Sequence, residues 1–148
     1  MILDVTGTAS WAKLTEATRD MGSSKAKGAM YDYPEATNLN VALDQADLIK
    51  VMEVLPKIKV QPTEDGMMVK FARKWVNDRF PQDGGEPEIV DKDGQPWDKT
   101  KIIGDGSQVR VAVEVFQTKF GPAGRLLKVM VLDYVESEFE PEQKELPF

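Results

Sequence analysis

Hydrophobic and polar residues alternate over much of this chain, a pattern that is typical of β-strands. Residues 37–43 place Leu39, Val41 and Leu43 on one face and predict a half-buried strand. Gly7 lies inside another such segment and indicates a bulge or bend there. Strands are predicted over residues 3–14, 66–76, 109–120 and 125–134, with a short strand inside residues 88–97.

The last two long strands have regular hydrophobic faces. Val109, Val111, Val113 and Val115 are predicted to point inward from one strand, and Leu127, Val129 and Val131 from the other. Residues 121–124 read Gly-Pro-Ala-Gly and are predicted to form the tight connection between these strands. The alternation turns Arg110 and Phe116 to the outside.

One segment has the period of a helix instead. Its apolar face is predicted to consist of Leu48, Val51, Met52 and Leu55, which follow the spacing i, i+3, i+4, i+7. Asp44 is the predicted N-cap, and Pro56 ends the helix. By contrast, residues 20–28 are rich in Gly, Ser and Lys, lack any period, and predict a mobile loop that carries Lys25 and Lys27.

This order of elements predicts an all-β fold with one helix. Short strands with a single helix between the early and late groups favour a small closed barrel of the OB type, a five-stranded Greek-key barrel. We expect this barrel domain to cover residues 1–135 of the 148. Residues 136–148 are predicted to form a disordered acidic C-terminal tail.

Composition excludes several classes of chemistry. The chain has 0 Cys and 0 His, so it holds no disulfide, zinc finger, cysteine nucleophile or histidine-based triad. No apolar run approaches the length of a membrane span, and no secretion signal precedes the first strand, so we expect a cytosolic protein without membrane contact. The sequence indicates no catalytic residue, cofactor or metal.

The net charge of -6 is concentrated at the C-terminal end. From Asp133 onward there are six acidic residues and one Lys, a charge of -5, which leaves -1 for residues 1–132. A nearly neutral body removes most of the objection that an acidic protein raises against a nucleic-acid partner.

Basic and aromatic residues are interleaved on the predicted strands. The first cluster comprises Lys70, Phe71, Arg73, Lys74 and Trp75, followed by Arg79 and Phe80; the second comprises Arg110, Phe116, Lys119, Phe120, Arg125 and Lys128. Single-stranded nucleic acid is bound by cations that contact phosphates and by flat rings that stack on bases. The alternative is that the rings fill the barrel and the cations form an ordinary solvated surface.

The tail and three aspartates suggest further chemistry. Leu146, Pro147 and Phe148 suit a docking peptide whose ring fills a partner's pocket, although a plain solvated tail is the alternative. Glu142-Gln143-Lys144 matches the acid-x-Lys pair of some metal-dependent nucleases but lies in the tail. Asp91, Asp93 and Asp98 match no metal-binding loop, and Asp93-Gly94 is typical of a turn.

Residues 66–135 resemble the single-stranded DNA-binding proteins of short-tailed bacteriophages of the T-seven type. The most specific stretch is IVDKDGQPW…KIIGDGSQVRVAVEVFQTKFGPAGRLLKVMVLDYVE, and Gly7-Thr8-Ala9 followed by Trp11 is similar to the family's opening strand. By this resemblance, Lys70 lies in the family's basic strand, Lys119-Phe120 at its DNA-facing hairpin, and Phe148 at its terminal aromatic position.

The resemblance implies an OB fold and sequence-independent binding of single-stranded DNA in phage DNA replication, recombination and repair, in the cytoplasm of the infected bacterial host. It also implies a homodimer. The acidic tail is implied to recruit the replicative polymerase and the helicase or primase, and to compete for the DNA groove.

Our hypothesis is a non-enzymatic single-stranded DNA-binding protein whose cations contact phosphates and whose rings stack on bases. The predicted DNA-binding residues are Trp11, Lys13, Lys25, Lys27, Tyr31, Tyr33, Lys70, Arg73, Lys74, Trp75, Arg110, Phe116, Lys119, Phe120 and Lys128. Two alternatives stay open: an OB-like protein–protein adaptor without nucleic-acid binding, and a metal-dependent nuclease.

Overall fold

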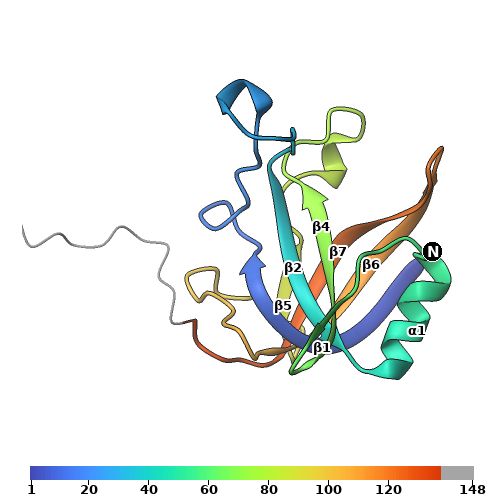
Figure 1. The fold of residues 1–148 in the computed structure, drawn as a ribbon. Coiled ribbons are helices and arrows are strands. Elements are labelled where there is room, and N and C mark those ends of the chain that lie inside the picture. Colours follow the sequence, from blue (N-terminus) through green and yellow to red (C-terminus); the bar gives the residue numbers. More distant parts are fainter. Residues whose placement is uncertain (138–148) are drawn as a thin grey trace, which may run out of the picture.

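A computed structural model describes residues 1–137 and shows one curved sheet with a helix at one side (Figure 1). The sheet has seven strands in the order β3-β4-β2-β1-β6-β7-β5. In chain order the elements are β1 (Ile2–Lys13), the 3-10 helix η1 (Lys25–Lys27), β2 (Ala36–Leu43), α1 (Gln45–Val54), β3 (Gln61–Thr63), β4 (Gly66–Lys74), the 3-10 helix η2 (Pro81–Asp83), β5 (Glu88–Asp91), β6 (Gln108–Thr118) and β7 (Gly121–Asp133). No helix within this range is long and apolar enough to cross a bilayer.

The predicted all-β barrel of OB type with one helix is confirmed. Its five long strands are β1, β2, β4, β6 and β7, and β4 approaches β7 to close the barrel. At this closure, Arg73 Nη1 donates a hydrogen bond to the carbonyl oxygen of Leu126 (3.3 Å). Two short strands are additional: β3 pairs with β4, and β5 pairs in parallel with β7.

The barrel interior is filled by branched aliphatic side chains. The inward valines of β6 are buried as predicted, and so are Leu39, Val41 and Leu43 of β2. Val69 and Phe71 of β4 point into the same core, which leaves Lys70 and Lys74 on the outer face. The strand alternation therefore places cations on the outside of the barrel.

The connection between β6 and β7 differs from the prediction. Residues 121–124 belong to β7, and the turn consists of Lys119 and Phe120, between the paired residues Thr118 and Gly121. The Thr118 side chain stabilises this turn, because its Oγ1 accepts from the Phe120 N–H (3.2 Å) and donates to the Gly121 carbonyl (2.7 Å). Gly121 has φ 112, so glycine is needed where the chain leaves the turn.

The inward face of β7 also differs from the prediction at Leu127. The register shifts between the pairs Ala112–Lys128 and Val113–Leu126, so that Leu127 is an extra residue in the strand. Such a bulge reverses the faces on either side of it. Leu126 is therefore fully buried and Leu127 is only half-buried, whereas Val129 is inward as predicted.

The predicted helix is confirmed and begins as expected, because the Asp44 side chain accepts a hydrogen bond from the Asp47 N–H (2.8 Å). Val51 and Leu55 are buried against the barrel. Met52 was predicted to share this face but is 38% exposed. The apolar face by which this short helix packs on the barrel is narrow, and Met52 lies at the edge of that face.

Residues 20–36, here called the arm, are more ordered than the loop predicted for residues 20–28. Backbone bridges join Asp20 to Ala36 and Ser23 to Tyr33, and η1 forms the tip. The Ser24 side chain caps η1, which explains how a segment without periodicity adopts local structure.

The irregularity expected at Gly7 lies elsewhere. The register of β1 shifts between Ser10 and Lys13, around Trp11. Gly7 instead permits close packing of β1 against β2, because a Cβ at this position would lie 2.3 Å from the Ala42 carbonyl oxygen.

Candidate nucleic-acid interface

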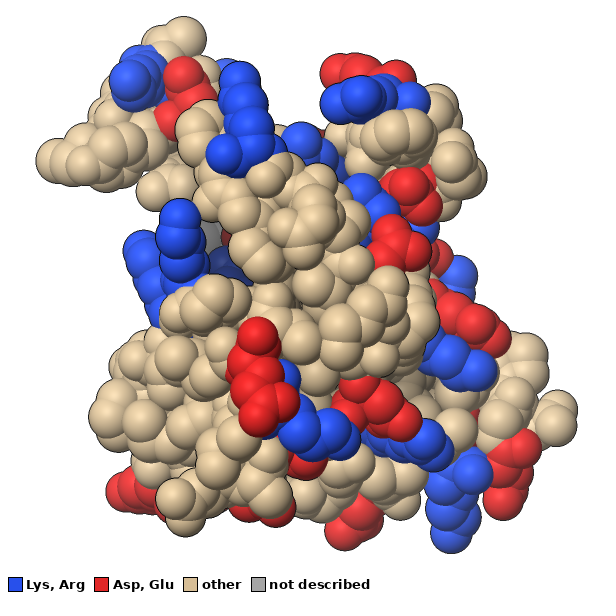
Figure 2. Space-filling view, turned by 90° about the vertical axis from the view of Figure 1, so that its right-hand side faces the viewer, with Lys and Arg blue, Asp and Glu red and all other residues tan. Residues whose placement is uncertain are grey.

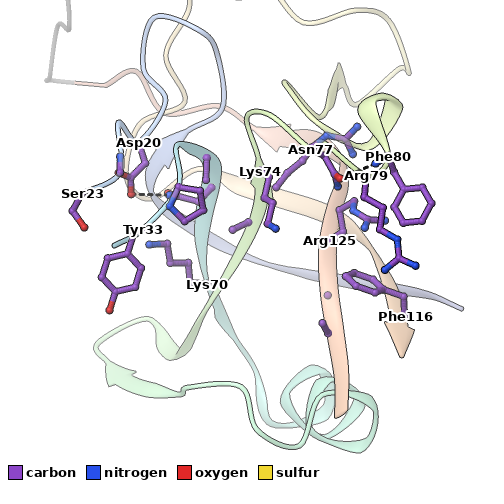
Figure 3. A pocket seen from close by; sticks show the side chains of 18 of the residues that line it. Asp20, Ser23, Tyr33, Lys70, Lys74, Asn77, Arg79, Phe80, Phe116 and Arg125 are labelled. Atoms are coloured by element: carbon purple, nitrogen blue, oxygen red, sulfur yellow. Dashed lines mark hydrogen bonds between the residues drawn. The ribbon is translucent and has the colours of Figure 1, made fainter. Parts of the chain in front are cut away.

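A hollow of about 970 Å³ lies on the outer face of β2 and β4. The arm bounds one end, and the segment after β4 together with the β6–β7 hairpin bounds the other (Figure 3). A second hollow of about 830 Å³ shares Arg79, Phe80, Phe116 and Arg125 with the first and continues to Phe120. Together they form a continuous surface depression, which we call the groove.

The floor of the groove follows from strand register. Lys70 pairs with Asn40, and Lys74 pairs with Ala36, so both lysines project from the outer face. Between them lies Ala72, whose small side chain keeps the floor open. Residues four apart along a strand are separated by roughly 13 Å. The floor thus presents two exposed ammonium groups along one strand.

Aromatic rings stand at the hairpin end of the groove. Phe80 is 43% exposed, and the Arg79 guanidinium carbon lies 5.3 Å from its ring centroid. Phe120 is 76% exposed at the turn, with Lys119 Nζ 5.2 Å from its ring centroid. Each of these rings has a cation over it and remains partly exposed, and a combination of exposed rings and cations is typical of surfaces that bind single strands.

Phe116 projects outward as predicted but is partly covered. The Arg125 guanidinium carbon lies 4.4 Å from the Phe116 ring centroid. Arg125 also forms ion pairs with Glu114 (2.6 Å) and Asp83 (3.4 Å). These contacts fix Arg125 and the Phe116 ring as one wall of the groove.

The arm contributes the rings at the other end. Tyr31 and Tyr33 are exposed, their ring centroids are 6.1 Å apart, and Tyr33 lines the groove. Lys25 and Lys27 are exposed on η1 at the arm tip and do not line the floor. The arm therefore supplies one ring to the groove and carries two further cations at its tip.

The groove carries an excess of positive charge. Apart from Arg73, which donates to backbone carbonyls, the following lining cations form no ion pair with an acidic residue within residues 1–137: Lys59, Lys70, Lys74, Arg79 and Lys119. Figure 2 shows Lys and Arg side chains around the notch between two upper lobes, and each lobe also carries acidic side chains. Basic and acidic side chains alternate over the lower half.

Asp20 is an acidic group at the arm end of the groove. The Gly22 N–H donates to its carboxylate (2.9 Å) and lowers the pKa of Asp20, and the charges of Lys13 and Lys70 lower it further. Asn38 Nδ2 donates to the same carboxylate (3.3 Å). Asp20 therefore stays ionised and ties the arm to β2.

Two predicted DNA-binding residues have structural partners. Arg73 donates to the carbonyl oxygens of Gln82 (3.0 Å) and Gly84 (3.3 Å) as well as Leu126, and burial lowers the pKa of its guanidinium. The Trp75 ring is stacked by Arg19, whose guanidinium carbon lies 4.8 Å from the ring centroid. Arg73 thus closes the barrel, and Trp75 packs beneath Arg19.

Arg110 and Lys128 lie apart from the groove, at a separate hollow on β1, β6 and β7. Arg110 forms a bidentate pair with Asp4, with its Nη2 2.6 Å from Asp4 Oδ2. Lys128 Nζ lies 3.7 Å from Glu88. Trp11 and Lys13 line yet another hollow.

Some groove residues are absent from the predicted set. Arg79 and Phe80 continue the basic-aromatic run of β4, so the sequence carried a signal for them. Lys59 comes from the irregular segment between α1 and β3, and nothing in its sequence surroundings distinguishes it. The predicted partner-binding residues Leu146, Pro147 and Phe148 lie outside the described residues.

Acidic side chains in the described part of the chain form no cluster of three that could hold a metal. The Asp91 carboxylate accepts from the N–H groups of Asp93 and Gln95 (both 2.9 Å), and Asp98 accepts from Thr100. These aspartates stabilise turns.

No protein-family model and no curated protein matches this chain. Among solved structures, it is similar to gp2.5, a single-stranded DNA-binding protein encoded by bacteriophage T7, with a TM-score of 0.58 and 15% identity over 97% of this chain and 98% of that one. It is also similar to the single-stranded DNA-binding protein from bacteriophage Enc34 in complex with single-stranded DNA, with a TM-score of 0.55 and 10% identity over 93% and 89% of the two chains. These similarities establish a shared fold.

Proposed function

We propose that this chain is a non-enzymatic protein that binds single-stranded DNA without sequence preference. The observation that carries the proposal is the groove, where cations without acidic partners lie between exposed aromatic rings at its two ends. The five unpaired cations of the groove contact phosphates, while Tyr33, Phe80 and Phe120 stack on bases. Two bacteriophage proteins with the same fold are described as binding single-stranded DNA, which supports the proposal.

The chemistry of the groove favours unpaired strands of any sequence. Rings stack on every base, because each base has a π-face, and a Lys contacts the phosphate of any nucleotide. In a duplex the base faces are stacked on one another and are unavailable to Phe80 and Phe120. Binding through these groups therefore selects single strands and not base identity.

We further propose that the protein acts in phage DNA replication, recombination and repair, in the cytoplasm of an infected bacterium. Under this proposal the acidic tail recruits the replicative polymerase and the helicase or primase, and the protein forms a homodimer. The tail also competes with DNA for the groove, because its carboxylates carry the same charge as phosphates.

The tail proposal is tested by truncation. Glu136 forms a backbone bridge with Ile103, so the cut is best made after Ser137. Removal of residues 138–148 is expected to raise the affinity for oligo-thymidine at low salt. Unchanged or weaker binding would contradict the competition.

A protein–protein adaptor would use the same exposed rings differently. The cores of protein interfaces are depleted in charge, whereas this groove has unpaired lysines on its floor, so the structure favours the nucleic-acid function. For the nuclease alternative, residues 1–137 hold no metal-binding cluster, and Glu142-Gln143-Lys144 lies outside the described residues.

The deciding experiment is fluorescence anisotropy with labelled oligo-thymidine, oligo-adenosine and a duplex of equal length, using the full-length protein in low salt. The two single strands are expected to bind with similar affinity and the duplex much more weakly. An equal affinity for the duplex, or no binding to either single strand, would refute the proposal.

A further inference from the structure

Trp11 has an unusual backbone and an unusual exposure. It lies in the bulge of β1 with φ 53, the one positive φ of a non-glycine residue within residues 1–137. Its indole is 68% exposed. The Asp105 carboxylate holds the bulge by accepting the Trp11 N–H (2.8 Å). Residues with such a strained backbone cluster at functional sites, and the exposed ring gives Trp11 a surface for a ligand.

The Trp11 ring borders a hollow of about 550 Å³, here called the Trp11 hollow. Ala12, Ala17, Ile102 and Ile103 give it a mainly apolar lining. A volume of this size accommodates a small planar molecule. The opposite charges of Lys13 and Asp105 in its lining offset each other, so the hollow favours a neutral planar group over an ion.

The Trp11 hollow adjoins the groove through strand register. Lys13 pairs with Asn38, and Asn38 pairs with Ala72 of β4, so these residues form one row across β1, β2 and β4. Asn38 and Ala72 line the groove, and Lys13 lines the Trp11 hollow. The bulge at Trp11 keeps Lys13 in this row, on the face that carries the groove. A strand lying along the row would pass from one hollow to the other.

We propose that the Trp11 hollow is a second base-stacking site, which takes a nucleobase of the same single strand beyond the segment bound in the groove. Lys13 contacts a phosphate between the two sites, and the Trp11 ring stacks on the base. The inference rests on the proposed function, since it requires that the groove binds single-stranded DNA.

The intrinsic fluorescence of the chain can test this directly, because Trp11 is the exposed member of its three tryptophans. Trp75 is stacked by Arg19, and Trp97 packs on Tyr134 with ring centroids 5.0 Å apart. The probes are labelled oligo-thymidines of about 4 and about 16 nucleotides, which span the site sizes of OB folds. Anisotropy of the label reports binding, and tryptophan emission reports stacking.

We expect both oligomers to bind, but only the longer one to quench tryptophan emission. Trp11→Phe should abolish this quenching, whereas the control Trp97→Phe should retain it. Trp11→Ala should weaken binding of the longer oligomer by about 5-fold or more and leave the shorter one unchanged, given the energy of one stacked base.

Three outcomes would overturn the second site while the proposed function stands: the longer oligomer binds without quenching, quenching persists in Trp11→Phe, or Trp11→Ala binds both lengths like the unmodified chain. If a peptide of residues 138–148 changes the tryptophan emission and DNA does not, the Trp11 hollow binds the tail, and the proposal of a second base-stacking site is refuted. Failure of both oligomers to bind at low salt would refute the proposed function itself.

Discussion

Replacing Lys70 and Lys74 by Gln should weaken DNA binding in a way that depends steeply on salt. Each phosphate contact to a single strand contributes about 0.7 to the slope of log K against log salt concentration. The five unpaired cations of the groove therefore predict a slope of about -3.5. Loss of two contacts should change the slope to about -2.1.

The same relation gives the loss of affinity. At about 0.1 M salt, two contacts with a combined slope of about 1.4 correspond to a factor of about 25. At about 1 M salt the variant and the unmodified protein should bind almost equally, because little free energy is then gained from counterion release. The glutamine side chain retains most of the packing of lysine, so the fold is expected to persist.

The assay is anisotropy of labelled oligo-thymidine across a salt series. The matched control is Lys92→Gln with Lys101→Gln, which removes the same charge from exposed positions that lie outside the groove. If both double variants lose the same slope, net charge and not the groove determines binding, and the reasoning is refuted. An unchanged slope in the Lys70 and Lys74 variant would refute it as well.

Three further predictions concern stacking, barrel closure and pH. Phe120→Ala should lower affinity by about 5-fold at every salt concentration with an unchanged salt slope, because stacking releases no counterions; a changed slope would argue against stacking. Arg73→Ala should lower the free energy of unfolding in urea titrations by about 2 kcal/mol, because it leaves carbonyl groups at the barrel closure without a donor. An unaltered midpoint of urea unfolding would contradict this role. Hydrogen bonds from Arg110 to Asp4 and from the Gly22 N–H to Asp20 lower the pKa values of these carboxyl groups below the ordinary 3.8. Their contribution to folding stability is therefore present above about pH 4 and is lost as the pH falls through the lowered pKa. A melting temperature equal at pH 7 and pH 3 would oppose this.

The sequence predicts the barrel well because the relevant signals are local. Alternating valines in β6, the Asp44 cap and the Lys70 alternation each depend on neighbours within a few residues. Errors arise where tertiary contacts change the register. The extra residue Leu127 cannot be recognised from one strand alone, because a bulge is defined by the partner strand.

The site is predicted less completely, since exposure depends on distant partners. The sequence predicts that Arg73 and Arg110 contact DNA, and the structure gives both of them protein partners. Arg73 donates to backbone carbonyls, and Arg110 pairs with Asp4 across β1 and β6. Lys59 enters the groove only because the segment after α1 returns beside β4. The sequence predicts the residue types that line the groove, and the fold determines which of them meet there.

Photocrosslinking of the full-length protein to an oligo-thymidine that carries halogenated uracils tests the central claim most directly. The account predicts crosslinked peptides that contain Tyr33, Phe80 or Phe120, identified by mass spectrometry. Crosslinks confined to the β1–β6–β7 surface around Arg110 and Lys128 would contradict it.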